Sequence, residues 1–179
     1  MVVYTYIAVG ASIYYARSPD ILFEYMQEVR PHYFTAVPRL VERLQNSILE
    51  RASTRGGLQR RLLHWAMRLG KKFPEARRMS LAYWLQHWLA DLFIYQRWRR
   101  LLGGKVEGII VGAAALQPEL GRLFSAAGLD IREGYGLTET SPVVSFNRFE
   151  PGGVRFGTVG IPIPGVEVKI DKPEGAEEG

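Results

Sequence analysis

The sequence has 179 residues, of which 47% are hydrophobic and 23% charged, with a net charge of +5 and no cysteine. This length and composition suit one globular unit with a sizeable core and argue against a disordered chain. The absence of cysteine excludes a disulfide scaffold, a thiol nucleophile and a cysteine-based metal site.

The positive charge is concentrated in the middle of the chain. Residues 39–105 hold 15 Lys and Arg against 4 Asp and Glu, whereas residues 106–179 hold 6 against 11. Such a basic segment suits anionic lipid, nucleic acid or another acidic partner. Because no known nucleic-acid module matches the Arg and aromatic residues between 60 and 100, we expect no nucleic-acid partner.

The first fifty residues predict alternating strands and helices. Residues 1–9 are apolar but too broken by Thr5 for a membrane span, and their periodicity does not separate helix from strand. Ser18 and Pro19 are typical of a helix start. The elements expected next are a strand at 11–16, a helix at 19–30, a strand at 32–37 and a helix at 38–50. This alternation predicts an α/β fold, a parallel-type sheet with flanking helices.

A basic, Trp-rich helical insert is expected at about 51–102. Its helices are predicted at 58–70 and roughly 75–102. On the second helix Leu81, Leu85, Trp88, Leu92 and Tyr95 recur at helical spacing. One interpretation is that the Trp and Leu stripes pack on each other while the Arg faces are solvated. The other is an interfacial surface, basic outside and aromatic within.

The alternation resumes after the insert and then changes character. We expect, in order, a strand at 105–111, a helix at 118–127 that begins at Pro118 and is followed by Gly128 at the C′ position, and a strand at 130–133. Residues 143–179 are rich in Gly and Pro and predict the start of a β-rich subdomain, with a strand at 166–170. The acidic end, 171–179, is expected to be a hairpin tip or a truncation point.

The stretch 131–142 reads IREGYGLTETSP and overlaps the strand expected at 130–133. Gly134 and Gly136 permit a positive φ or a close approach of the backbone to a ligand. We therefore expect a turn that presents Tyr135 between them.

The side chains of this stretch suit a nucleotide. The ring of Tyr135 can stack on a base, the hydroxyl of Thr138 can bond a phosphate oxygen, and the carboxylate of Glu139 can hold a hard cation such as Mg²⁺. The strand at 105–111 also ends in small residues, at 112–115. Since ligands in open α/β sheets bind outside the carboxyl ends of strands, both segments are expected at one site. The alternative is a strand-to-turn junction with a satisfied surface glutamate.

The segment 134–140, GYGLTET, closely resembles a signature of the adenylate-forming (AMP-forming) synthetase superfamily, most of all its long-chain fatty-acid–CoA ligases. Four further segments resemble that family in the family's own order: 10–15, 31–44, 111–116 and 157–165. The helical insert and the Val-Pro-Arg stretch that ends at Arg39 favour the long-chain branch.

The resemblance implies a role for each matching residue. Tyr135 would stack on adenine, Thr138 would bond the α-phosphate, and Glu139 would hold Mg²⁺, which makes Thr138 and Glu139 the catalytic candidates. The residues implied to line the adenine and the acyl carboxylate, or to shape the loop, are Gly112, Ala113, Ala114, Glu133, Gly134, Gly136 and Leu137. The loop at 112–115 reads Gly-Ala-Ala-Ala where the family often has Gly-Gly-Ala or Ala-Ala-Pro.

The reaction implied by the resemblance has two steps. A fatty-acid carboxylate attacks the α-phosphate of Mg²⁺-bound ATP to give acyl-AMP and pyrophosphate, and the thiol of CoA then displaces AMP. The implied cofactors are ATP/AMP and Mg²⁺, with CoA as co-substrate and a fatty acid as the acid substrate. We expect a cytoplasmic location and leave open a peripheral position on an anionic inner-membrane surface.

By the same resemblance, residues 1–142 would be a partial adenylation core and 143–179 the start of the next subdomain. The family's phosphate loop would lie upstream, and its ribose-binding Asp and C-terminal domain with a catalytic Lys downstream. We therefore expect an internal fragment that is inactive alone and whose open strand edges favour a homo-oligomer or swapped dimer. Two alternatives stay open: a ligase for another carboxylate, or a non-catalytic module that binds a membrane surface.

Overall fold

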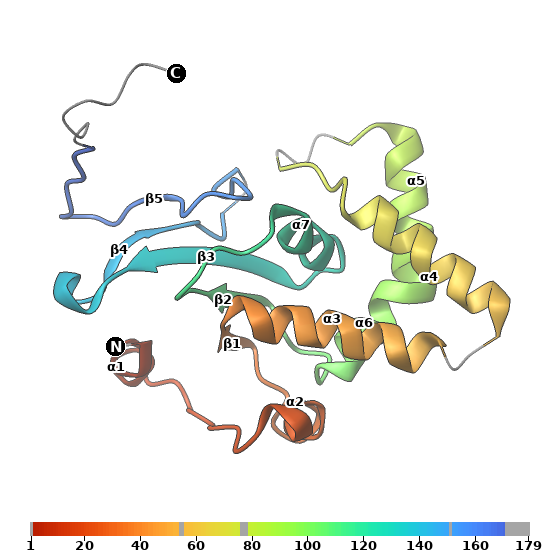
Figure 1. Ribbon diagram of the computed structural model, residues 1–179, viewed down its shortest axis with the longest axis horizontal. Helices are drawn as coiled ribbons and strands as arrows, with labels where there is room; N and C mark the ends of the chain where they lie inside the picture. Colours follow the sequence, from red (N-terminus) through yellow and green to blue (C-terminus); the bar gives the residue numbers. More distant parts are fainter. Residues whose placement is uncertain (1, 54–55, 76–78, 151, 171–179) are drawn as a thin grey trace.

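The computed structural model describes residues 2–53, 56–75, 79–150 and 152–170, and its centre is a mixed five-stranded sheet (Figure 1). The strands lie in sequence order and are β1 (Tyr33–Ala36), β2 (Gly108–Val111), β3 (Asp130–Gly136), β4 (Val143–Phe146) and β5 (Ile161–Pro162). Strands β1, β2 and β3 are parallel, whereas β3, β4 and β5 pair antiparallel.

The predicted parallel sheet is confirmed for the first three strands. Ala36 pairs with Val111, and Val111 pairs with Glu133, so β1 and β2 end level at one edge of the sheet, while β3 runs three residues further to Gly136. The buried strand residues Ile109 and Ile131 join these strands to one hydrophobic core with the helices. This level edge places the loop after β2 beside the distal half of β3.

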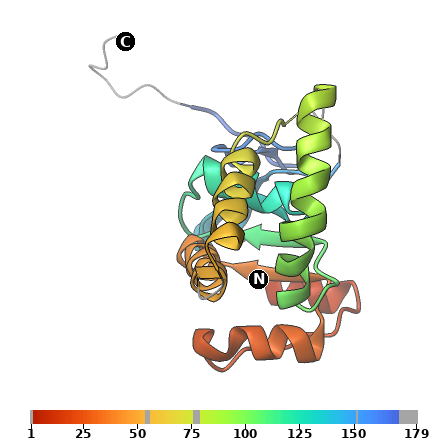
Figure 2. The same cartoon turned by 90° about the vertical axis from the view of Figure 1, so that its right-hand side faces the viewer.

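Helices pack around the sheet and carry most of the core. They are α1 (Val2–Ala8), α2 (Leu22–Val29), α3 (Pro38–Ser53), α4 (Gly57–Gly70), α5 (Leu81–Ala90), α6 (Gln96–Leu101) and α7 (Pro118–Ala126). A π-helical segment, Asp91–Tyr95, joins α5 to α6, and Figure 2 shows the three as one continuous rod beside α4. Several predicted boundaries are confirmed: Pro118 begins α7, and Gly128 follows it with φ +72°.

Two predicted strands are wrong. Residues 11–16 form no strand, and the side chains of Tyr14 and Tyr15 are exposed. Residues 166–170 form no strand either, and Ile170 is exposed, while the short pairing with β4 is made by β5 instead. Aromatic and β-branched residues stabilise a strand through side chains of a neighbouring strand, which neither segment has in the described part of the chain. The expectation for residues 171–179 lies outside the described residues.

The helical insert also differs from its prediction. Its second helix begins at Leu81, not near residue 75, because the side chain of Ser80 accepts a hydrogen bond from the backbone N–H of Tyr83 at 3.2 Å and caps the helix. The stripe expected to pack is instead exposed at Leu81, Leu85, Trp88 and Leu92. The opposite face, which carries Ala90 and Ile94, enters the core.

The π-helical segment explains why Tyr95 is buried although Trp88 and Leu92 are exposed. A π-helical turn holds an extra residue, which rotates the face of all later residues relative to earlier ones. Tyr95 therefore turns inward, and its hydroxyl donates to the carbonyl of Ala66 at 2.6 Å. Regular helical spacing across residues 81–95 could not reveal this rotation.

Candidate nucleotide site

The two segments expected to form a site are neighbours in the structure. A Cβ atom placed on Gly112 would lie 3.6 Å from the carbonyl oxygen of Gly134, so the loop after β2 touches the distal half of β3. This confirms that the two segments are neighbours, although Gly134 lies within β3 and not at its end, because the strand continues to Gly136. Within the loop, Ala113 and Ala114 are exposed, and Ala113 has φ +70°. A positive φ is unfavourable for a residue with a Cβ atom, so the loop stores strain at this edge.

Glu133 of β3 bonds the loop that follows β2. Its side chain is buried, and Oε1 accepts a hydrogen bond from the backbone N–H of Leu116 at 3.1 Å. Burial raises the pKa of the Glu133 carboxyl, and hydrogen bonds from the N–H groups of Leu116 and Gly157 oppose part of that rise. The carboxyl thus joins three chain segments that are distant in sequence: the loop after β2, β3 and the turn at Gly157.

Gly134 and Gly136 do not form the turn that was expected at the motif. Strand β3 continues through Gly134 and Gly136 and pairs antiparallel with β4, with a register shift after Tyr135. Neither glycine is among the residues with positive φ. They are required because the protein itself comes close: a Cβ atom on Gly134 would lie 2.9 Å from the ring of Phe146, and one on Gly136 would overlap the carbonyl oxygen of Pro142.

The turn begins after β3 and is closed by Thr140, which was not among the predicted site residues. Its Oγ1 accepts a hydrogen bond from the backbone N–H of Leu137 at 3.0 Å. The same hydroxyl lies 2.8 Å from the carbonyl oxygen of Pro142, to which it can donate. The sequence could have indicated this role, because Thr140 lies three residues after Leu137 and hydroxyl side chains often bond nearby backbone groups in short turns.

Tyr135, Leu137, Thr138 and Glu139 are all exposed, and we call these four residues the nucleotide wall. Tyr135 is 47% exposed although it belongs to β3, and the 3-10 turn Thr138–Thr140 holds the hydroxyl and the carboxylate just beyond it. An aromatic ring, a hydroxyl and a carboxylate on adjacent backbone offer a stacking face, a hydrogen bond and a hard-oxygen ligand. Glu133, by contrast, is buried and bonds the backbone of the loop after β2.

Glu139 is the candidate metal ligand. Within the described ranges no group of three or more His, Asp or Glu could hold a metal ion. A lone exposed carboxylate still fits Mg²⁺, which is usually bound through one or two carboxylates together with substrate phosphates and water. The donor set therefore suits a phosphate-bridged cation and not a dedicated protein cage.

The chain is similar in sequence to known proteins. Long chain acyl-CoA synthetase 6, peroxisomal, of Arabidopsis thaliana is 33% identical over 176 residues, which is 97% of this chain and 24% of the relative. The long-chain-fatty-acid–CoA ligase FadD15 of Mycobacterium bovis is 33% identical over 144 residues, 79% of this chain and 23% of the relative. The chain thus spans about a quarter of the length of the curated relatives it matches.

A solved structure shares the fold. The crystal structure of the anthranilate CoA ligase AuaEII in complex with anthranoyl-AMP superposes with a TM-score of 0.54 at 20% identity, covering 95% of this chain and 24% of that one. The profile of the AMP-binding enzyme family matches residues 1–179. The chain therefore belongs to the AMP-binding enzyme family.

Proposed function

We propose that the chain supplies one wall of the nucleotide site of an AMP-forming long-chain fatty-acid–CoA ligase. The observation that carries the proposal is the contact between the Gly112–Ala114 loop and the distal half of β3, beside the exposed Tyr135, Thr138 and Glu139. Family membership and the names of the long-chain relatives support the reaction and the substrate class.

Each residue of the nucleotide wall would have its own role in adenylation, the first step of the reaction. The ring of Tyr135 would stack on adenine, and the loop from Gly112 to Ala114 would approach both the base and the acyl carboxylate. The hydroxyl of Thr138 would donate to an oxygen of the α-phosphate, to which negative charge shifts during attack. Mg²⁺ held by Glu139 would neutralise charge on the transferring phosphates.

Atoms balance across the two steps. One carboxylate oxygen of the fatty acid forms a bond to the α-phosphorus of ATP, and the bond to the bridging oxygen of pyrophosphate breaks. The thiolate of CoA then attacks the acyl carbon, the bond from that carbon to the bridging oxygen breaks, and AMP leaves with that oxygen. Since this wall carries neither a catalytic lysine nor a cradle for pyrophosphate, we propose that the 179-residue chain alone does not complete adenylation.

A ligase for another carboxylate is the second candidate. The shared fold with an anthranilate CoA ligase does not favour it, because 20% identity shows the fold alone. A panel of fatty, aryl and amino acids assayed with the complete ligase that carries this segment separates the two. Turnover confined to aryl or amino acids would overturn the long-chain assignment.

Substitution of the metal candidate tests the site itself. In the complete ligase Glu139→Gln should abolish most Mg²⁺-dependent pyrophosphate release, because an amide oxygen is a weaker ligand for a hard cation. Glu150→Gln, which removes another exposed carboxylate, is the matched control and should retain activity. Near-normal turnover of Glu139→Gln, or acyl-AMP formation by the 179-residue chain alone, would contradict the proposal.

We also propose a peripheral contact with an anionic membrane through α5. Within the described ranges no helix is long and apolar enough to cross a bilayer. Nevertheless the outer face of α5 and of the π-helical segment after it exposes five large apolar side chains: Leu81, Trp84, Leu85, Trp88 and Leu92. Trp and Leu on the face of a helix in a strongly basic segment are typical of binding to the interface of anionic bilayers.

Vesicle flotation tests this contact. Trp84→Ser with Trp88→Ser should reduce binding to phosphatidylglycerol vesicles, and wild-type binding should weaken as salt rises, because surface charge is screened. Leu58→Ser, on an exposed residue of α4 outside the stripe, is the control. Equal binding of the double variant and wild type would rule out the stripe.

The expected self-association stays a proposal. Strands β1 and β5 form the two edges of the described sheet, and an open edge can pair with a second chain. A single monomeric mass in light scattering at high concentration would contradict it.

A further inference from the structure

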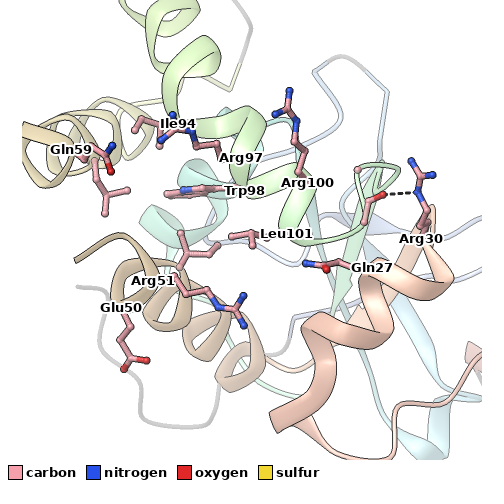
Figure 3. Close-up of a pocket in the computed structure, with 14 residues that line it drawn as sticks. Gln27, Arg30, Glu50, Arg51, Gln59, Ile94, Arg97, Trp98, Arg100 and Leu101 are labelled. Carbon is pink, nitrogen blue, oxygen red and sulfur yellow. Dashed lines mark hydrogen bonds between the residues drawn. The ribbon is translucent and has the colours of Figure 1, made fainter. Parts of the chain in front are cut away.

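A cavity between helices lies away from the candidate nucleotide site. It measures about 1100 Å³ and is bounded by α2, α3, α4 and the rod that ends in α6 (Figure 3). Gly103 and Gly104, which line it, precede β2, whereas the nucleotide wall begins in the distal half of β3 and continues past its end. The strands therefore separate the two sites, and neither shares a lining residue with the other.

The floor of the cavity is apolar and built from the core. Ile48, Leu63, Ile94 and Trp98 are buried residues of four helical elements, α3, α4, the π-helical segment and α6, and Leu101 of α6 also lines the cavity. Figure 3 shows Trp98 and Leu101 facing α3 across the opening. Such a floor offers a place for a hydrocarbon chain or a ring, and a polar ion alone would leave it in contact with water.

The rim of the cavity is cationic. Its charged residues are Arg30, Arg51, Arg97, Arg100 and a single acid, Glu50. Arg30 donates to the carbonyl of Gly103 at 3.0 Å, and the guanidinium of Arg51 lies over the ring of Phe23 at 4.6 Å. Two of the arginines are thus held at the rim by the protein itself.

Arg97 and Arg100 complete the rim from α6. Both are exposed, and in the part of the chain that the structure describes neither forms an ion pair. Their neighbour Arg99 behaves differently, because it forms a bidentate pair with Asp91 at 2.6 and 3.0 Å and bonds the carbonyl of Ala127. On α6, therefore, Arg99 bonds other parts of the protein, whereas Arg97 and Arg100 line the cavity.

We propose that this cavity binds a phosphate-bearing amphiphile, with the phosphate at the arginine rim and the apolar part on the floor. Arginine guanidinium groups pair with phosphate through two parallel hydrogen bonds. Arg97 and Arg100 bring two positive charges to the rim, and a phosphate monoester carries nearly two negative charges. The proposal concerns a site distinct from the nucleotide wall and does not depend on the proposed function.

The test is a direct binding measurement on the 179-residue chain by isothermal titration calorimetry. Dodecyl phosphate, kept below its micelle concentration, is the probe, and inorganic phosphate and dodecyl maltoside each supply one half of its chemistry. We expect dodecyl phosphate to bind about tenfold or more tightly than either half, because charge pairing and apolar burial contribute together. Binding no tighter than inorganic phosphate would overturn the use of the floor, and binding no tighter than dodecyl maltoside would overturn the use of the rim.

Two double variants locate the site. Arg97→Gln with Arg100→Gln should lower the affinity about tenfold to a hundredfold, since each lost charged hydrogen bond is worth roughly a factor of ten. Arg60→Gln with Arg61→Gln removes the same charge from exposed positions on α4 outside the cavity lining and should leave the affinity unchanged. Equal losses in both pairs would show an effect of overall charge and overturn the site.

Two sources of such a ligand are separated by a third arm. Phosphatidylglycerol vesicles present phosphate on a surface, whereas dodecyl phosphate presents it on a free molecule. Binding of the free molecule, lost in the Arg97 and Arg100 pair, supports the cavity whichever source supplies the ligand. Binding to vesicles without binding of monomeric dodecyl phosphate would overturn it in favour of a surface contact.

Discussion

Oε1 of Glu133 accepts a hydrogen bond from the backbone N–H of Leu116 at 3.1 Å, which ties the loop after β2 to the end of β3. The bond is made inside the protein, where water cannot substitute for either partner. The position of the Gly112–Ala114 loop therefore depends on a carboxyl group that is buried beneath the surface.

The raised pKa of Glu133 makes stability depend on pH in a direction opposite to that of most carboxylates. Burial raises the folded-state pKa above its usual value of 4.5, so folding favours the protonated form. The contribution is complete below the unfolded-state pKa and is lost as pH rises through the folded-state pKa. Each unit of pKa difference corresponds to about 1.4 kcal/mol.

Glu133→Gln should remove this dependence. The amide oxygen can still accept from the N–H of Leu116, but it carries no charge to desolvate. The free energy of unfolding of wild type relative to Glu133→Gln should fall as pH rises from about 4 to neutrality. Urea titrations across this range measure the difference, and Glu150→Gln controls for loss of an exposed carboxylate. A difference that grows with pH would contradict the prediction.

Gly136 should tolerate no side chain. A methyl group there would overlap the carbonyl oxygen of Pro142, which is backbone and cannot move aside without breaking the β3–β4 pairing. Gly136→Ala should cost about 3 kcal/mol or more of unfolding free energy, in the range of severe backbone and packing defects. Gly57→Ala, in the first turn of α4 with open space around it, should change stability by less than about 1 kcal/mol. Thermal unfolding of the two variants makes the comparison.

At Ala113 we expect that removing the side chain stabilises the protein. Its φ of +70° is unfavourable for alanine and easy for glycine, so Ala113→Gly should stabilise the chain by about 0.5–1 kcal/mol after the added flexibility of the unfolded chain is counted. Ala114→Gly is the matched control, because Ala114 is not among the positive-φ residues and should lose stability. Equal changes in both variants would show that the strain at Ala113 has no energetic effect.

The proximity of the two segments was largely predictable because its signals are local. Small residues follow two buried strands, and strand–helix alternation makes those strands parallel, so Gly112 and Gly134 had to meet at one edge. The motif predicted a turn that presents Tyr135, whose side chain is exposed although it lies on β3 and not on a turn. What it could not give was the reason for the glycines, since Phe146 and Pro142 approach them only once β4 folds back.

Longer-range features were less predictable. Helical spacing shows that Leu81, Leu85 and Trp88 share a face, but it does not say whether that face meets the core. The π-helical turn then moves Tyr95 to the other side, and nothing in the spacing marks the inserted residue. The false strands have the same origin, because alternation describes one strand and leaves its partner unspecified.

Thr140 closes the turn that carries Thr138 and Glu139, and its hydroxyl is the group to test. Thr140→Val keeps the shape but removes the acceptor of the Leu137 N–H and the donor to the carbonyl of Pro142. Because the turn is exposed and water can replace part of the loss, the cost should be about 1 kcal/mol. Thr140→Ser retains the hydroxyl and should stay within about 0.5 kcal/mol of wild type.

Amide hydrogen exchange reports on this turn directly. The N–H of Leu137 should exchange faster in Thr140→Val than in wild type or Thr140→Ser, because an exposed amide without an acceptor is open to water. Amides of β2 lie in the buried centre of the sheet and should be unaffected, which separates local opening from global unfolding. Unchanged protection of Leu137 in Thr140→Val would mean that strand pairing alone holds the turn, and the hydroxyl would then have no part in placing Glu139.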